Sequence, residues 1–378
     1  MSKTSADVLI VGGGVIGCAA AYALAREGLD VLLLERGEIG CQSSGAAAGM
    51  LTPVAESVKS QVLRKLGLQS LAEFPNLCAQ LLELSGIDAD FVASGVLRVA
   101  ENDSQAQALR QLAATVSSTH PELGLTWLTS EDALGAEPQL TPSQHGALWS
   151  PREAHVHSPL LTRAFEGAAR ALGARIELGV SVQGLLRSGE RVAGVRTSAG
   201  DRHADHVLLC NGAWAGELVE WLGDQVGVPP LPVAPVRGQI LALDATSPPI
   251  AAIIWGSDTY LVPKRDGSVM VGTTEEWVGF DCKTTAEGIA GLLSAAPELV
   301  PALARARFRK AWAGLRPGSP DGLPAIAAIE SAPGLVVAVG HFRTGFLLAP
   351  VTARLLSDIV LGKATPSELA DFDPKRWA

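Results

Sequence analysis

Residues 7–35 read D-V-L-I-V-G-G-G-V-I-G-C-A-A-A-Y-A-L-A-R-E-G-L-D-V-L-L-L-E, and this stretch decides the fold. An apolar run is followed by Gly12, Gly14 and Gly17, then by small residues and a second apolar run that ends at Glu35. The pattern predicts a strand, a tight glycine turn, a helix and a second strand. The glycines permit the turn, the approach of a diphosphate and close helix–sheet packing, and the diphosphate would lie at the helix N-terminus. Glu35 is then placed to accept hydrogen bonds from an adenosine ribose.

The same stretch permits two other interpretations. The glycines could form a turn in an ordinary α/β core. Residues 8–25 contain no charged side chain, so they could also be a signal peptide or a membrane span. Lys3 and Asp7 give the preceding residues no positive bias, and three consecutive glycines are unfavourable in the centre of a helix. Nucleotide binding is the favoured interpretation.

Length, composition and charge narrow the class of protein. The 378 residues suffice for two domains, and 47% hydrophobic against 18% charged residues is typical of a largely buried α/β protein. A net charge of −9 argues against nucleic acid or an anionic membrane as the main partner. Five scattered cysteines form no C-x-x-C pair and no metal pattern, so we expect reduced thiols and a cytoplasmic location. The cysteines are Cys18, Cys41, Cys78, Cys210 and Cys282.

The segment that follows the second strand consists almost wholly of small residues. Residues 41–50 read C-Q-S-S-G-A-A-A-G-M, which allows the backbone to approach a flat ligand, although a flexible linker is the alternative. The hydroxyls of Ser43 and Ser44 could donate hydrogen bonds to phosphate oxygens.

Hydrophobic periodicity predicts the remaining elements. We expect helices at residues 61–84, 104–117, 159–172, 284–296, 298–306 and 349–361. We expect strands at residues 91–100, 125–128, 207–210, 238–243, 255–262, 268–273 and 335–339, and a strand pair within 175–195. A strand–glycine loop–helix unit therefore appears at each end of the chain, with an antiparallel sheet between them. This organisation favours a bound flavin over a diffusible nicotinamide.

His155 and His157 would share one face of a strand and could suggest a metal. Because no third ligand is near in the sequence, we expect no metal and assign both to hydrogen-bonded roles at a domain junction.

Three long motifs resemble one flavoprotein family. They are S-S-G-A-A-A-G-M-L at 43–51, W-A-G-L-R-P-G at 312–318 and G-H-F-R-T-G-F-L-L-A-P at 340–350. Over nearly its whole length the chain resembles the D-amino-acid oxidase and glycine/sarcosine oxidase family, most closely the glycine oxidases of the thiamine pathway. The resemblance implies an α/β fold with a Rossmann-like, glutathione-reductase-like FAD domain and an inserted α+β substrate domain built on an antiparallel sheet. The FAD domain would comprise residues 1–83, 151–226 and 312–378, and the substrate domain residues 84–150 and 227–311.

The resemblance also implies which residues hold FAD. Val15, Ile16, Glu35 and Arg36 would bind the ADP part, and Val182 the adenine through its backbone. The small-residue segment would line the diphosphate and isoalloxazine through Ser43, Ser44, Ala48, Gly49 and Met50. The pyrimidine edge of the flavin would be bordered by His341, Phe342, Arg343, Thr344, Gly345, Phe346 and Leu347. A helix N-terminus there stabilises the negative charge of the reduced ring. The flavin is expected to be non-covalent, because no cysteine lies between residues 302 and 378.

Arg316 is the first candidate for binding substrate. A planar guanidinium binds an amino-acid carboxylate bidentately and would orient the Cα–H bond toward flavin N5. By the resemblance, the Tyr260 hydroxyl also contacts that carboxylate, and Arg343 lies near flavin and substrate. The alternatives are a surface ion pair for Arg316, a core aromatic for Tyr260 and a loop-holding role for Arg343.

The implied activity is oxidation of glycine, sarcosine or small D-amino acids by hydride transfer to FAD. Dioxygen would reoxidise the cofactor, and a homotetramer is expected. Thr344, Asp258 and Glu275 depart from the family pattern of asparagine, histidine and methionine, which leaves the preferred amine open. One alternative is a D-amino-acid or proline dehydrogenase that reduces a quinone, which would need a docking segment that we do not see. Another is a non-catalytic FAD-binding sensor, which would be expected to lack Arg316 and Tyr260.

Overall fold

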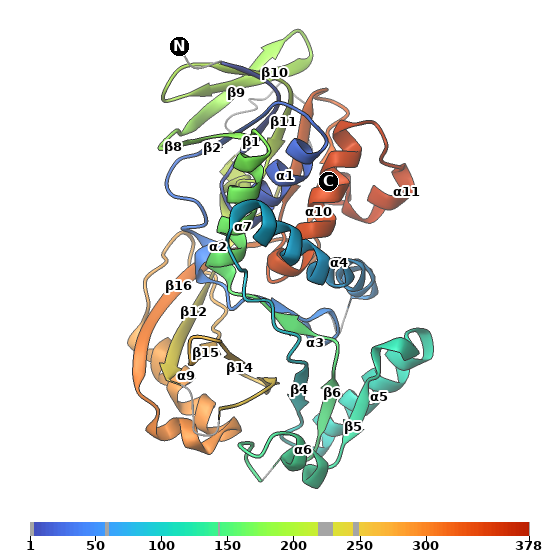
Figure 1. Cartoon of the computed structure of the whole chain (residues 1–378), viewed down its shortest axis with the longest axis vertical. Coiled ribbons are helices and arrows are strands. Elements are labelled where there is room, and N and C mark those ends of the chain that lie inside the picture. Colours follow the sequence, from blue (N-terminus) through green and yellow to red (C-terminus); the bar gives the residue numbers. More distant parts are fainter. Residues whose placement is uncertain (1–3, 57–59, 143, 218–229, 245–248, 378) are drawn as a thin grey trace.

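Two eight-stranded sheets form most of the strand structure in the part of the chain that the structure describes (Figure 1). The computed structural model describes residues 4–56, 60–142, 144–217, 230–244 and 249–377. In Figure 1 the first sheet and its helices lie above the second sheet, and the chain passes between the two several times. The expected α/β fold with a second, mainly antiparallel sheet is confirmed.

The first sheet collects strands from both ends and from the middle of the chain. Its order is β17-β18-β11-β1-β2-β8, and the antiparallel pair β9–β10 branches from β11. The strands are β1 (Ser5–Val11), β2 (Val31–Glu35), β8 (Arg175–Leu178), β9 (Val182–Ser188), β10 (Arg191–Thr197), β11 (Arg202–Leu209), β17 (Ala325–Ala328) and β18 (Leu335–Val339). β1 pairs in parallel with both β2 and β11, so the carboxyl ends of these strands meet at one edge.

Four helices cover one face of the first sheet. They are α1 (Val15–Arg26), α4 (Gln61–Ser85), α7 (Ser158–Ala171) and α10 (Gly345–Val360). The alanine-rich sequence of α1 lets α7 and α10 pack closely on it, because small side chains bring helix axes together. With only 12 residues, α1 is too short to cross a bilayer, and none of the helices that the structure describes is long and apolar enough to do so. The short α11 (Pro366–Leu369) follows α10.

The second sheet has the order β16-β12-β15-β14-β13-β4-β6-β5. Its strands are β4 (Val96–Val99), β5 (Thr126–Leu128), β6 (Ala147–Ser150), β12 (Ala234–Asp244), β13 (Ile253–Trp255), β14 (Tyr260–Pro263), β15 (Ser268–Gly272) and β16 (Phe308–Gly318). All neighbours are antiparallel except β4 and β13, which pair in parallel. The helices of this half are α5 (Asp103–Thr119), α6 (Ser130–Ala136) and α9 (Ala286–Leu299).

A short two-stranded sheet joins the halves. It pairs β3 (Met50–Leu51) with β7 (Ala154–His155), and the small helices α2 (Ser43–Ala46) and α3 (Pro53–Glu56) flank β3. The small-residue segment therefore passes from β2 of the first sheet into α2 and β3 rather than forming a flexible linker.

Several boundaries differ from the expectation. The single strand expected at 255–262 is a hairpin of β13 and β14, because the chain turns where the Gly256 N–H bonds to the Thr259 carbonyl. Residues 298–306 form only a short 3₁₀ helix, Pro301–Arg305, since a proline cannot continue the hydrogen bonding of α9. The strand expected at 91–100 is confined to β4.

Of the expected domain boundaries, 150/151 coincides with the end of β6, whereas the others fall inside regular elements or outside the described residues. Helix α4 runs through the boundary at 83/84, and strand β16 runs through the boundary at 311/312 while it pairs with β12. The boundary at 226/227 lies outside the described residues. The division of the chain into these segments stays a prediction.

Candidate active site

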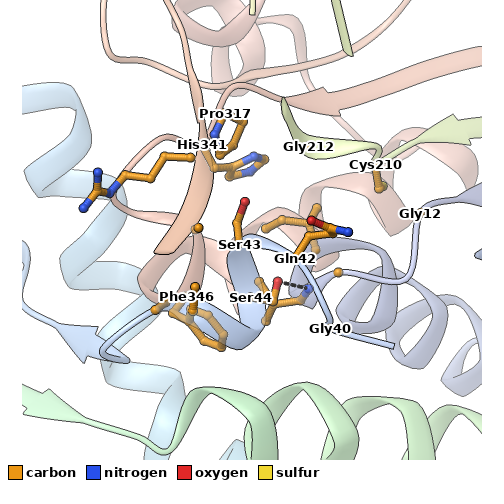
Figure 2. Close-up of a pocket in the computed structure, with 18 of the residues that line it drawn as sticks. Gly12, Gly40, Gln42, Ser43, Ser44, Cys210, Gly212, Pro317, His341 and Phe346 are labelled. Carbon is orange, nitrogen blue, oxygen red and sulfur yellow. Dashed lines mark hydrogen bonds between the residues drawn. The ribbon is translucent and has the colours of Figure 1, made fainter. Parts of the chain in front are cut away.

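A cavity of about 430 Å³ lies between the two sheets. Every residue that the sequence suggested for cofactor or substrate lines it, apart from Gly17. Figure 2 shows the Gly12 turn, Ser43, Ser44 and His341 around this space. The fold thus brings together residues that are separated by more than 300 positions in the sequence.

The glycine turn connects β1 to α1 at the carboxyl edge of the first sheet. Gly12 has φ +110°, and a Cβ there would lie 2.5 Å from the Cys210 carbonyl oxygen. A Cβ on Gly17 would lie 1.9 Å from the Gly12 carbonyl oxygen. Gly17 therefore permits helix–sheet packing without reaching the cavity, and only glycine fits at either position.

Glu35 stands at the tip of β2, as expected, but its carboxylate already accepts two hydrogen bonds. Gly13 N–H donates to Oε2 at 2.7 Å and Gly37 N–H to Oε1 at 2.8 Å. A carboxylate has about four acceptor positions, so capacity for a ribose hydroxyl remains. Beside it, the Arg36 guanidinium stacks on the Trp214 ring at 4.1 Å from the centroid.

The two serines of the small-residue segment differ in their roles. The Ser44 hydroxyl oxygen accepts a bond from Val15 N–H at 3.0 Å, so its hydrogen remains available to donate to a ligand. The Ser43 hydroxyl donates to the Leu315 carbonyl, so its hydrogen is already committed. The structure therefore offers Ser44, rather than Ser43, as the donor toward a phosphate.

The N-terminus of α10 supplies the opposite wall. Residues 341–347 all line the cavity, and Thr344 is the residue that precedes the helix. His341 is buried, and its Nε2 lies 3.1 Å from Thr352 Oγ1. Burial lowers the pKa of His341 to about 3, so the ring is neutral. The helix N-terminus and the guanidinium of Arg343 are then the sources of positive potential on this side.

Arg316 extends from β16 over Gly238 of the neighbouring strand β12. Its Nη2 donates to Thr273 Oγ1 at 2.6 Å and its Nη1 to the Thr274 carbonyl at 3.2 Å. A Cβ on Gly238 would lie 2.3 Å from Arg316 Nη2, so this glycine makes room for the guanidinium. No ion pair to Arg316 forms within the described residues, and burial lowers its pKa without neutralising it. The surface ion pair considered for Arg316 is thus absent from the described residues.

Tyr260 lies on β14 of the same sheet, with β12 and β15 between it and β16. It pairs with Gly272 across β14 and β15, and a Cβ on Gly272 would lie 2.4 Å from its hydroxyl oxygen. The side chain is buried and packs edge-on against Trp255 at 5.7 Å between ring centroids. Burial raises the pKa of Tyr260, so the hydroxyl is a hydrogen-bond donor at neutral pH.

Arg343 lines the cavity but is already paired. Its Nε bonds to the Glu56 carboxylate, and its Nη1 lies 3.3 Å from Glu275 Oε2. Burial tends to lower the pKa of Arg343, but the Glu56 carboxylate outweighs it and the net shift is upward. Asp258 is exposed and does not line the cavity.

Sequence reasoning missed Glu56, Gly238 and Thr273. Glu56 ends a four-residue helix that has no periodic signal, and the two others lie within or just after strands whose pairing the sequence does not reveal. Their roles follow only from contacts across the sheets.

The two histidines considered as metal ligands have structural roles. His157 Nδ1 accepts a bond from Leu160 N–H at the start of α7, and His155 is buried beside Lys264. No group of three metal-ligating side chains occurs in the described part of the chain. All five cysteines are free thiols.

Comparison with known proteins identifies the family. The family of FAD dependent oxidoreductases designated DAO matches residues 7–359. The chain belongs to the DAO family of FAD-dependent oxidoreductases. Its cofactor, FAD, and its class, oxidoreductase, follow from that membership.

Individual DAO-family relatives resemble the chain over its whole length. A glycine oxidase of Pseudomonas aeruginosa is 36% identical over 98% of this chain and 99% of its own. The crystal structure of glycine oxidase from Geobacillus kaustophilus matches with a TM-score of 0.93 and 34% identity, over 99% of each chain. The bifunctional protein ThiO/ThiG of Trichormus variabilis is 33% identical over 98% of this chain, which spans only 55% of that longer protein.

The residues present fit the FAD of the DAO family. Gly12, Gly13 and Gly14 line the cavity without side chains, so the backbone of the turn is open to a ligand there. Asn211 Oδ1 is buried at the cavity wall and has no hydrogen-bond partner among the described residues, which is costly unless a ligand donates to it. Backbone N–H groups at the N-termini of α1 and α10 complete a site for a dianionic diphosphate and for a ring that becomes negatively charged on reduction.

Glu153 holds the backbone of α3 and makes stability depend on pH. Its buried Oε1 accepts bonds from Val54 N–H at 2.7 Å and Ala55 N–H at 3.0 Å, and burial raises its pKa from 4.5 to about 7. Between pH 4.5 and 7 the folded state therefore holds a proton that the unfolded state has lost. The contribution of Glu153 to stability is fully present below pH 4.5 and falls by about 3 kcal/mol as the pH rises through 7.

We therefore expect Glu153→Gln to remove this pH dependence. The melting temperature of the variant should rise relative to the wild type by a few degrees between about pH 5 and pH 8, as measured by thermal unfolding of the FAD-bound protein. Glu131→Gln, at an exposed position on α6, is the control. Parallel curves for wild type and Glu153→Gln would contradict the assignment.

Proposed function

We propose that the protein oxidises the Cα–N bond of small amino acids and that glycine is its preferred substrate. One observation carries this proposal: Arg316 presents a guanidinium that no carboxylate of the described residues pairs with, beside the buried hydroxyl of Tyr260 in the cavity that fits FAD. The Arg316 guanidinium and the neutral Tyr260 hydroxyl both donate hydrogen bonds, and one carboxylate group of a substrate can accept from both.

Arg343 and its carboxylate partners set the charge of the rest of the site. Two carboxylates, Glu56 and Glu275, face two guanidiniums, so the four side chains sum to zero charge. A zwitterionic amino acid preserves that balance, whereas a second substrate carboxylate would add an uncompensated charge in a partly buried site. This supports small monocarboxylic amino acids over dicarboxylic ones, and it supports a pairing role for Arg343.

The chain's own residues bind and orient the substrate. Arg316 holds the carboxylate, Tyr260 donates to it, and together they fix the Cα–H bond toward the cofactor. When bound, FAD accepts the Cα hydrogen as a hydride and passes the two electrons to dioxygen. The substrate nitrogen loses one proton, dioxygen gains two electrons and two protons to become hydrogen peroxide, and water converts the imine to 2-oxo acid and ammonia. No described side chain is needed as a dedicated base.

The proposal is tested by measuring peroxide in air with glycine, sarcosine and D-alanine. We expect peroxide from glycine at a rate at least equal to that from D-alanine. Bleaching of the flavin by amines without peroxide in air would favour a dehydrogenase that delivers electrons to a quinone. No bleaching with any amine would refute both.

A conservative change at Tyr260 tests its role. Tyr260→Phe removes one hydrogen bond to a charged carboxylate, and we expect KM to rise about tenfold with a smaller change in kcat. Tyr22→Phe is the matched control, because the other tyrosine of the chain bonds to Gln80 at 3.1 Å and does not line the cavity. Equal KM values for the two variants would remove Tyr260 from the substrate site.

Two wider roles belong to the same proposal. The resemblance of the three motifs to glycine oxidases of the thiamine pathway supports a function in that pathway, where the imine would supply the thiazole. The homotetramer stays a prediction, to be checked by light scattering of the purified protein.

A further inference from the structure

Four consecutive carbonyls of the small-residue segment are each held from outside the cavity. Trp312 Nε1 donates to Ala46 O at 3.0 Å, and Ser158 Oγ donates to Ala47 O at 2.7 Å. The next two acceptors are Ala48 O, which Lys264 Nζ reaches at 2.6 Å, and Gly49 O, which a backbone N–H reaches at 2.9 Å. The donors come from β16, α7, the β14–β15 turn and the residue after β7. The segment is therefore fixed by elements of both halves.

Lys264 differs from the other donors because it carries a charge. Its side chain is 8% exposed, and it also donates to the Val156 carbonyl at 2.9 Å and lies 3.5 Å from His155 Nδ1. No carboxylate lies within ion-pair distance of it among the described residues, although Asp90 and Asp266 act on it from further away. An ammonium buried on carbonyls alone is costly, so its retention calls for a reason.

The position of the Lys264 ammonium suggests why a buried charge is retained there. Ala48 lines the cavity, whereas Lys264 does not, so the ammonium lies directly behind the wall that Ala48 and Gly49 form. Burial lowers the pKa of Lys264 to about 7, and burial together with Lys264 lowers that of His155 to about 3. His155 is thus neutral in weakly acidic solution, whereas Lys264 is positively charged behind Ala48.

We propose that Lys264 is a positioning residue for the flavin: it fixes the Ala48 peptide and places a positive charge behind the isoalloxazine. This inference rests on the location of the ring against residues 48–50 and goes beyond the proposed function. A positive charge at this position favours every state in which the ring carries negative charge. The hydrogen bonds and the charge can be separated by substitution, because glutamine can donate to a carbonyl without a charge.

The experiment compares Lys264→Met, Lys264→Gln and Lys264→Arg with the control Lys310→Met. Lys310 is an exposed lysine that stacks on Trp312, at 4.7 Å from the ring centroid. The readouts are the FAD dissociation constant and the dissociation constant for sulfite at about pH 6, below the pKa of Lys264. Sulfite adds to flavin N5 and leaves negative charge on the ring, so it reports the local charge without any turnover.

We expect Lys264→Met to raise the dissociation constants for FAD and for sulfite about tenfold or more, since it removes the hydrogen bonds and the charge. For Lys264→Gln, the FAD dissociation constant should stay within about threefold of the wild-type value, while the sulfite dissociation constant rises about tenfold. For Lys264→Arg, the sulfite dissociation constant should stay within about threefold of the wild-type value. Wild-type sulfite affinity in Lys264→Gln would overturn the proposal, and so would a Lys264→Met variant equal to Lys310→Met. If Lys264→Met does not fold, the glutamine variant decides. A wild type that binds sulfite but oxidises no amine would refute the proposed function and leave this inference intact.

Discussion

Replacing Arg316 by methionine should lower kcat/KM for glycine about a thousandfold. The guanidinium is the anchor that we assign to the substrate carboxylate, and loss of a hydrogen-bonded charge partner in a partly buried site costs about 2–5 kcal/mol. The variant Arg316→Lys would keep the charge but lose the planar fork, so we expect an intermediate loss of about ten- to a hundredfold. The measurement is steady-state peroxide formation, with the flavin spectrum as a check that FAD is still bound.

A second variant tests the same anchor without altering it. Gly238→Ala would place a Cβ 2.3 Å from Arg316 Nη2 and force the guanidinium to move. We expect kcat/KM to fall about tenfold or more while FAD binding is retained. Gly291→Ala on α9, where a Cβ meets nothing within 4 Å, is the control. Near-normal activity in both Arg316→Met and Gly238→Ala would exclude Arg316 from substrate binding.

Replacing Gly17 by alanine should abolish FAD binding. A Cβ would lie 1.9 Å from the Gly12 carbonyl oxygen, a backbone atom that cannot move without opening the turn between β1 and α1. The N-terminus of α1 would then be displaced from the diphosphate, and we expect FAD affinity to fall at least about a hundredfold. The absorbance of the purified protein and an FAD titration measure this. Gly135→Ala, at a position on α6 with no atom within 4 Å, should bind FAD normally. A yellow Gly17→Ala protein with wild-type affinity would contradict the role of the turn.

Local sequence determined the glycine turn and the fold class. The order strand, G-x-G-x-x-G, helix and strand contains its own geometric requirements, because a turn at φ +110° and a contact of this closeness exclude every other residue type. The same holds for the apolar periodicity of α4 and α7, whose buried faces follow from spacing alone. These features involve neighbours within one supersecondary unit, so they can be read without knowing the rest of the fold.

The sequence suggested site residues only where the chain resembles a known family. The resemblance to a known family suggested Arg316, Tyr260 and residues 341–347, and the structure places all of them around one cavity, while their roles stay predictions. Asp258, which departs from the family pattern, lies exposed in the turn between β13 and β14 and does not line the cavity.

Tertiary structure alone decided which partners these residues have. Pairing of Arg343 with Glu56, the space that Gly238 leaves for Arg316 and the contact of Lys264 with Ala48 each join residues more than 70 positions apart. Such contacts depend on strand register and on how the two sheets meet, and neither quantity is encoded in local periodicity. The sequence by itself therefore determined the nucleotide-binding unit and the family, because these rest on short-range geometry. The charge balance around Arg316 and Arg343 and the buried lysine behind the cavity wall arise from long-range packing, and only the folded chain reveals them.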